Sequence, residues 1–175
     1  MKADEVQISI LMSVYNPVEA ELSQAVSSIC KQKFTDWELL LYNDGSDDAY
    51  EKIFAHINGM DSRIRYIRGE INHGLWYGLN RCIEYANGRY LARMDGDDES
   101  LPERLSEQYV FLETHPEYNW VGSSILLFDG DVIWGERSYP EKPKAEDFFE
   151  YLPYAHPTVM FRREIFDECG GYRNR

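Results

Sequence analysis

The stretch YLARMDGDD, residues 90–98, runs from an apolar strand pattern directly into three carboxylates. Short apolar runs bounded by turn residues are typical of buried strands. Two like charges ~4 Å apart repel by about 4 kcal/mol at an effective dielectric of 20, so a carboxylate cluster at a strand end favours a bound cation. Clustered carboxylate oxygens suit Mg²⁺ or Mn²⁺, with waters and phosphates completing the shell. The alternative is a solvated acidic turn.

Upstream of this stretch, short apolar runs alternate with amphipathic stretches. We expect strands at residues 6–14, 37–42, 64–67 and 89–94. We expect helices at residues 18–29, 50–57 and 75–86. Strands that alternate with helices predict an α/β fold with a mostly parallel sheet and helices on both faces. Ligands of such sheets bind beyond the carboxyl ends of the strands, so polar clusters at strand ends are the candidate site.

The pattern becomes mixed after residue 100. We expect helices at residues 101–114 and 145–151, strands at 120–128 and 132–134 joined as a hairpin, and an extended piece at 157–161. The turn Asp129-Gly130-Asp131 favours the hairpin. This half therefore adds antiparallel elements to the parallel half, within one domain that spans residues 1–175.

The composition excludes several partners. The net charge of −13 argues against nucleic acid, which requires clustered Lys and Arg. No apolar run approaches the ~18 residues of a membrane-spanning helix, so no transmembrane segment is expected. The N-terminal stretch MKADEVQ lacks the apolar region of a secretory signal, and we expect a cytoplasmic protein, or one at the inner face of the membrane. A nucleotide diphosphate would need a cation or backbone donors to bind so acidic a chain.

Two further strand ends carry polar side chains. Asp44 follows the second expected strand, where its carboxylate is placed either to accept a hydrogen bond from a nucleoside or to cap its own turn. Both interpretations stay open. Ser13 and Tyr15 end the first expected strand, where Tyr15 is placed to stack on a base and Ser13 to donate to it. Packing at the strand end is the alternative for both.

Five motifs in order resemble the inverting glycosyltransferases of family 2. They are Ser13-Val14-Tyr15-Asn16, Asn43-Asp44-Gly45-Ser46-Asp47-Asp48, Asn72-x-Gly74 with Leu79-Asn80, Arg93-Met94-Asp95-Gly96-Asp97-Asp98 with Leu101-Pro102 and Arg104-Leu105, and His156-Pro157 through Gly170-Gly171-Tyr172. The resemblance runs from Val6 to Tyr172.

The resemblance implies a Rossmann-like glycosyltransferase A-type fold, with residues 1–100 as the nucleotide-sugar-binding half and 101–175 as the start of the acceptor-binding half. It implies transfer of a sugar from a nucleotide-sugar, most often UDP-linked, to a hydroxyl of a glycan or lipid-linked acceptor, in cell-surface polysaccharide or glycan biosynthesis. By position, Ser13, Tyr15 and Asp44 line the nucleoside pocket. Asp95 and Asp97 form the D-x-D pair on Mn²⁺ or Mg²⁺, with Asp97 the direct ligand. The motifs also place Asn16, Asn72, Gly74 and Gly96 at the donor site.

The general base is the part of the family pattern that this sequence lacks. The family carries it in a Glu-Asp pair after the Gly-Gly-Tyr segment, so we expect it beyond Arg175 and the catalytic domain to be incomplete here. Glu146-Asp147 precedes His156 and is interpreted as the start of a surface helix. Two alternatives remain, a nucleotide-sugar-binding module without turnover and a sugar nucleotidyltransferase. The second would normally show a Gly-rich, basic loop after the first strand.

Overall fold

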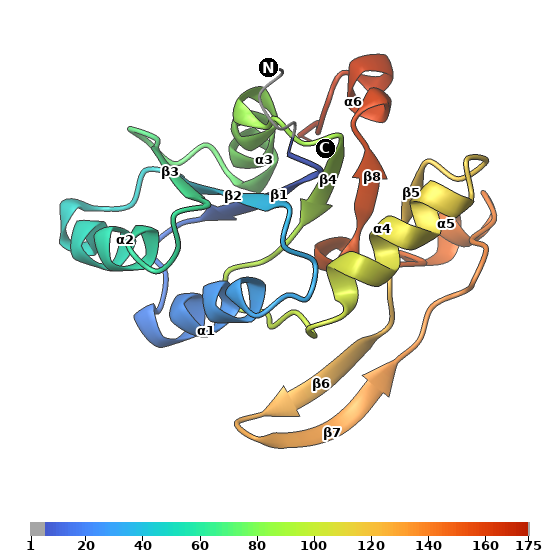
Figure 1. The fold of residues 1–175 in the computed structure, drawn as a ribbon, viewed down its shortest axis with the longest axis horizontal. Helices are drawn as coiled ribbons and strands as arrows, with labels where there is room; N and C mark the ends of the chain where they lie inside the picture. The colour runs from blue at the N-terminus through green and yellow to red at the C-terminus, as the bar shows by residue number, and fades with distance from the viewer. Residues whose placement is uncertain (1–5, 175) are drawn as a thin grey trace.

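A computed structural model describes residues 6–174. A six-stranded sheet forms its centre, with helices on both faces (Figure 1). Residues 1–5, which belong to the stretch where no secretory signal was expected, and Arg175, beyond which the base was expected, lie outside the described residues.

The first half of the chain supplies the parallel part of the sheet. Its elements are β1 (Ile8–Val14), α1 (Glu19–Cys30), β2 (Trp37–Asn43), η1 (Asp48–Tyr50), α2 (Glu51–Asn58), β3 (Ile64–Arg68), α3 (Leu75–Tyr85) and β4 (Tyr90–Arg93). Strand β1 pairs in parallel with β2 and β4, and β2 pairs in parallel with β3. The four strands and three helices expected from the sequence are confirmed, with ends shifted by one or two residues.

Two apolar clusters hold the helices to the sheet. Because successive strand residues point to opposite faces, β1 sends Ile10 and Met12 to one cluster and Leu11 to the other. The first cluster packs α1, α2 and α4 (Arg104–Thr114) onto one face, and the second packs α3 and α6 (Glu164–Cys169) onto the other. A fully buried Leu or Ile side chain contributes about 1.5–3 kcal/mol, so these faces fix the sheet whose edge carries the polar loops.

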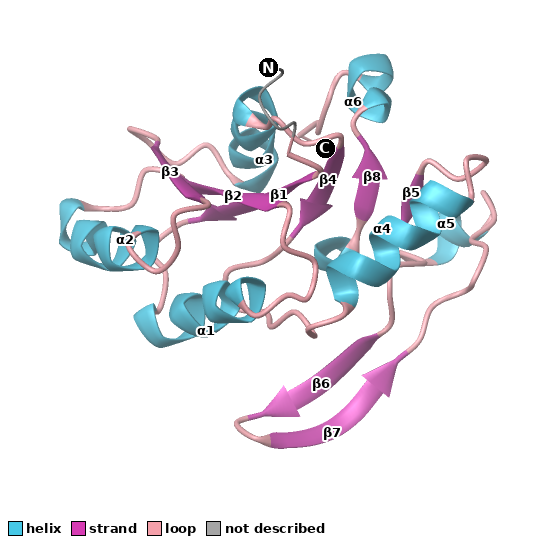
Figure 2. Cartoon of the chain, viewed as in Figure 1, coloured by secondary structure: helices cyan, strands magenta, loops and turns pink. Residues whose placement is uncertain are grey.

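The second half differs in part from the expectation. After α4 it contains β5 (Trp120–Val121), β6 (Ile125–Asp129), β7 (Val132–Arg137), α5 (Asp147–Glu150), η2 (His156–Thr158), β8 (Met160–Arg162) and α6. The hairpin at Asp129-Gly130-Asp131 is confirmed as β6–β7, which stands apart from the central sheet (Figure 2). Helix α6 was not predicted.

The single strand expected at residues 120–128 is wrong. Strand β5 pairs with β8 in the central sheet, whereas β6 pairs with β7. The chain leaves the sheet between them, where the backbone N–H of Ser123 donates to Oγ1 of Thr158 at 3.0 Å. A side chain therefore replaces the neighbouring strand as the partner of this backbone group, and the apolar pattern on either side hides the break.

The strand order is β3-β2-β1-β4-β8-β5. The chain builds outward from β1 to β3, then returns to the other side of β1 with β4, so a topological switch point lies between β1 and β4. Open α/β sheets bind ligands at such points, outside the carboxyl ends of the strands. Strand β8 is antiparallel to β4 and to β5, and so the second half contributes two strands to the same sheet. None of the helices within residues 6–174 is both long and apolar enough to cross a bilayer.

Candidate functional site

Three loops meet at the switch point. After β1, the N–H of Asn16 donates to Oγ of Ser46 at 2.9 Å, and Asn16 has a φ of 46°. The N–H of Asp44 donates to the carbonyl of Val14 at 2.8 Å. A Cβ added at Gly96 would lie 2.6 Å from Cγ1 of Val14, so the acidic loop needs a glycine to pass this close to β1. Loops that the sequence separates are therefore fixed against one another.

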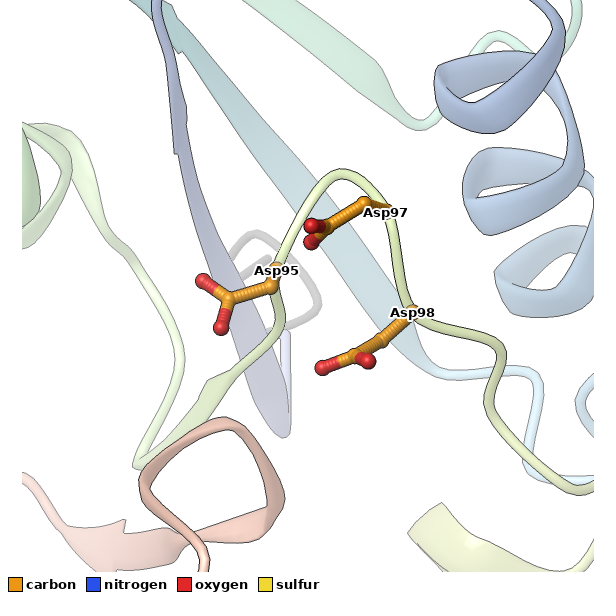
Figure 3. Close-up of side chains that lie close together, drawn as sticks. All are labelled: Asp95, Asp97 and Asp98. Atoms are coloured by element: carbon orange, nitrogen blue, oxygen red, sulfur yellow. The ribbon is translucent and has the colours of Figure 1, made fainter. Parts of the chain in front are cut away.

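The acidic loop after β4 brings three carboxylates together. Asp95, Asp97 and Asp98 each offer an oxygen within 4.8 Å of the others. Figure 3 shows the carboxyl groups of Asp97 and Asp98 directed toward the side of the loop from which Asp95 projects. Asp97 is exposed, whereas Asp95 and Asp98 are partly buried. The structure thus places the predicted pair in one cluster with Asp98, the third carboxylate of the stretch, which the resemblance did not assign to the cation.

The charges of this cluster are only partly compensated by the protein. Nη2 of Arg93 donates to Oδ1 of Asp95 at 2.6 Å, and the Arg93 side chain is 2% exposed. Burial raises the pKa of Asp98, and the negative charges of Asp95 and Asp97 raise it further. Several convergent oxygen ligands with excess negative charge are the donor set that Mg²⁺ and Mn²⁺ prefer, so the residues present fit such a cation.

The carboxylate of Asp44 holds a distant loop. Its side chain is buried, and it accepts hydrogen bonds from the N–H of His73 at 3.1 Å and of Gly74 at 2.7 Å. The turn-capping role proposed for Asp44 belongs to its neighbour instead, because Oδ1 of Asn43 accepts from the N–H of Ser46 at 2.8 Å. Asp44 therefore fixes the chain that enters α3 at the edge of the site.

We expect Asp44→Asn to destabilise the protein by about 1–3 kcal/mol, because the amide NH₂ would face a backbone N–H that loses its acceptor. The 73–74 loop would loosen as well. Urea unfolding measures the loss of stability. The matched control is Asp48→Asn, whose exposed carboxylate pairs with Arg68 at the surface and should change stability by less than about 0.5 kcal/mol. Unchanged stability for Asp44→Asn would contradict the role in loop fixation.

The other predicted residues lie around these loops. Ser13 abuts α3 closely, since a Cβ on Gly78 would lie 1.9 Å from its Oγ. Tyr15 is 50% exposed just beyond β1, which leaves its ring free to stack on a planar ligand. Asn72 is exposed, and Gly74 has a φ of 90° at the start of α3. Their positions are compatible with a shared site, and their roles stay predictions.

Sequence reasoning missed Arg93, Arg104, His156 and Tyr172 as neighbours of the cluster. Nη2 of Arg104 donates to the carbonyl of Arg93 at 2.7 Å and to that of Pro157 at 3.2 Å, which ties η2 to the end of β4. Nε and Nη1 of Arg93 and the hydroxyl of Tyr172 are buried without a hydrogen-bond partner. The available signal was an arginine inside an otherwise apolar strand, because a charged side chain is rarely buried unless it is paired.

The sequence profile of Glycosyl transferase family 2 matches residues 9–170. The chain belongs to this family. Its relatives include EpsE of Bacillus subtilis (strain 168), 37% identical over 96% of this chain. The O-antigen biosynthesis glycosyltransferase WbnJ of Escherichia coli is 31% identical over 95% of this chain and 67% of its own length.

Family 2 relatives also include WfgD of Escherichia coli, a UDP-Glc:alpha-D-GlcNAc-diphosphoundecaprenol beta-1,3-glucosyltransferase. It is 35% identical over 94% of this chain and 63% of its own length. The chain spans 60% of the length of EpsE, so it matches a part of that relative.

Solved structures show the same fold. The S. aureus TarS fragment 1-349 in complex with UDP-GlcNAc has a TM-score of 0.75 at 19% identity, over 96% of this chain and 48% of that chain. The mannosyltransferase PcManGT from Pyrobaculum calidifontis, in complex with GDP-Man and Mn²⁺, has a TM-score of 0.72 at 14% identity, over 95% of this chain and 47% of that chain. The expected family 2 architecture, a glycosyltransferase A-type α/β fold with a mostly parallel sheet, is confirmed.

Proposed function

We propose that this chain is the donor-binding part of a glycosyltransferase that moves a sugar from a UDP-sugar to an acceptor hydroxyl with inversion, in the presence of Mn²⁺ or Mg²⁺. The observation that carries the proposal is the carboxylate cluster of Asp95, Asp97 and Asp98 at the switch point of the sheet. The family membership supports the reaction class, and the names of relatives support polysaccharide biosynthesis. A glycan or lipid-linked acceptor is proposed on the same basis, with WfgD as the example.

A cation at the carboxylate cluster would offset the electrostatic repulsion between this acidic chain and an anionic substrate. The chain carries a net charge of −13, and a nucleotide diphosphate brings further negative charge. Asp95, Asp97 and Asp98 would hold the cation. When bound, the cation supplies positive charge to the diphosphate and so stabilises the leaving group as a Lewis acid.

The protein groups around the cluster bind and orient the donor. Tyr15 is exposed next to the loop of Asp44, and its ring would stack on the base. Asp44 and Ser13 line the nucleoside side, and Asp44 also fixes the 73–74 loop. Holding the donor in one orientation lowers the entropic barrier of the transfer step.

We assign the general base to none of the described residues and propose that it lies after the Gly170-Gly171-Tyr172 segment, beyond Arg175. Asp147 starts the short helix α5, and its Oδ2 accepts from the N–H of Lys144 at 2.8 Å. This contact is that of a helix start, as expected for Glu146-Asp147.

Calorimetry with UDP tests the proposal directly. We expect binding in the presence of Mn²⁺ or Mg²⁺ and at least a tenfold loss of affinity with EDTA, because the diphosphate would then face uncompensated carboxylates. The same titration with Ca²⁺ shows whether the site prefers the smaller cations, and titration with GDP tests the choice of base. Equal affinity for UDP with and without EDTA would contradict the cation-dependent site.

A further inference from the structure

The antiparallel strand β8 places a histidine near the carboxylate cluster of Asp95, Asp97 and Asp98. Ala92 of β4 pairs with Met160 of β8, and the N–H of Arg93 donates to the carbonyl of Val159 at 2.8 Å. Since β8 runs opposite to β4, the residues before β8 lie at the carboxyl end of β4. His156 of η2 therefore lies beside the start of the acidic loop, although it is distant in sequence.

Hydrogen bonds hold η2 in this place. Arg104 bridges the carbonyls of Arg93 and Pro157 through one nitrogen. Nε2 of Gln108 donates to the carbonyl of Thr158 at 2.7 Å. The backbone that directly follows His156 is thereby tied to α4 and β4, which makes its position part of the core structure rather than of a free loop.

The ring of His156 has a packed side and a free polar edge. It packs against Tyr172 with a centroid distance of 5.7 Å and against Tyr154 at 6.5 Å. Tyr172 is fixed in turn, because the side-chain amide of Asn80 accepts from its N–H and donates to its carbonyl, both at 2.9 Å. His156 is partly exposed, and within residues 6–174 no group hydrogen-bonds to its ring nitrogens.

The surroundings of His156 keep its imidazole neutral. Burial and, to a smaller extent, the charge of Arg93 lower the pKa of His156 to about 4, and Asp95 opposes the shift. A neutral imidazole has one N–H donor and one acceptor nitrogen. A hydroxyl group also donates and accepts, so it can hydrogen-bond to either ring nitrogen. An ionised phosphate oxygen only accepts, so it can bond to the N–H alone.

We propose that His156 binds a hydroxyl group of the donor sugar and thereby contributes to the choice of sugar. The inference rests on the proposed function, because the sugar is attached to the diphosphate that the adjacent cluster would hold. The carboxylate cluster and His156 would then bind neighbouring parts of one ligand. The cluster would hold the diphosphate through the cation, and the imidazole would hydrogen-bond to the sugar.

The test compares a nucleotide with nucleotide-sugars. Calorimetry in Mn²⁺ is run with UDP, UDP-glucose, UDP-galactose and UDP-N-acetylglucosamine. For His156→Ala we expect UDP to bind within twofold of wild type and the best-bound UDP-sugar to bind about 10-fold more weakly, the loss typical of one hydrogen bond. His156→Phe retains a ring against Tyr172 and should show the same loss. His156→Asn retains a donor and an acceptor and should recover part of the affinity.

The control is His56→Ala, an exposed histidine of α2. We expect no change for any ligand with this variant. Wild-type affinity of His156→Phe for every UDP-sugar, or equal weakening of UDP and UDP-sugars by His156→Ala, would overturn the inference while the donor site stands. Failure of the wild type to bind UDP or any of the sugars would instead overturn the proposed function, and the role of His156 with it.

Discussion

Asp97→Ala is expected to lower the affinity for UDP in Mn²⁺ to the level measured in EDTA, a loss of about tenfold or more. Asp97 is the exposed member of the cluster, and its carboxylate makes no hydrogen bond or ion pair among the described residues. Its removal would therefore take away the proposed cation ligand without breaking a contact of the fold. Calorimetry with and without EDTA measures the effect, and urea unfolding should show a change in stability below about 0.5 kcal/mol.

Glu99→Ala is the matched control for this variant, because Glu99 is an exposed acid of the same loop that lies outside the cluster. It removes the same charge and should leave the cation dependence intact. Asp98→Ala should have a smaller effect than Asp97→Ala. If Asp97→Ala and Glu99→Ala bind UDP equally well in Mn²⁺, the loop acts through net charge and the ligand assignment of Asp97 is wrong.

Asp95→Ala is expected to destabilise the fold by about 3–5 kcal/mol, the cost of leaving a buried charge without its partner. Arg93 is 2% exposed, two of its nitrogens have no partner, and Nη2 on Asp95 makes its ion pair. The free energy of unfolding in urea measures the loss. Loss of UDP binding by Asp95→Ala is therefore no evidence for a cation ligand by itself, because part of the protein would be unfolded.

The double variant Arg93→Met with Asp95→Ala separates the two roles of Asp95. Replacement of a buried ion pair by apolar groups is often neutral in stability, so the double variant should recover most of the lost free energy. Cation-dependent UDP binding should stay weak, since the carboxylate is absent. A cost below 1 kcal/mol for the single variant would show that Arg93 does not depend on Asp95.

The parallel half of the fold was predictable because its signals are local. Each strand is a short apolar run, and each run ends in polar residues, so the carboxyl edge and its loops followed from the strand–helix alternation. The cluster at 95–98 was found in the same way. The resemblance assigned the cation to Asp95 and Asp97 only, and the spacing of the three carboxylates in the sequence does not show that Asp98 converges with them.

The remaining features depend on contacts that no local pattern contains. The position of His156 follows from the antiparallel pairing of β8 with β4, and the break between β5 and β6 follows from a contact with Thr158. The hydrogen bonds of Asp44 to the 73–74 loop likewise join two loops across the sheet edge. Sequence reasoning identified Asp44 but not the hydrogen bonds that its carboxylate accepts. The turn motif is compatible with either nucleoside binding or turn capping, and it contains no sign of a contact with the 73–74 loop.

The order of the strands also constrains the order of events during synthesis. Strand β5 lies at the sheet edge and its sheet neighbour is β8, which the ribosome makes some forty residues later. Trp120 and Val121 therefore have no strand partner until the β6–β7 hairpin, η2 and β8 have been synthesised. Non-local strand pairing is slow and leaves apolar edges open to aggregation, so a nascent chain that pauses before Met160 should be a preferred client of chaperones. Arrival of β8 would dock β5 and deliver His156 to Asp95 in the same step.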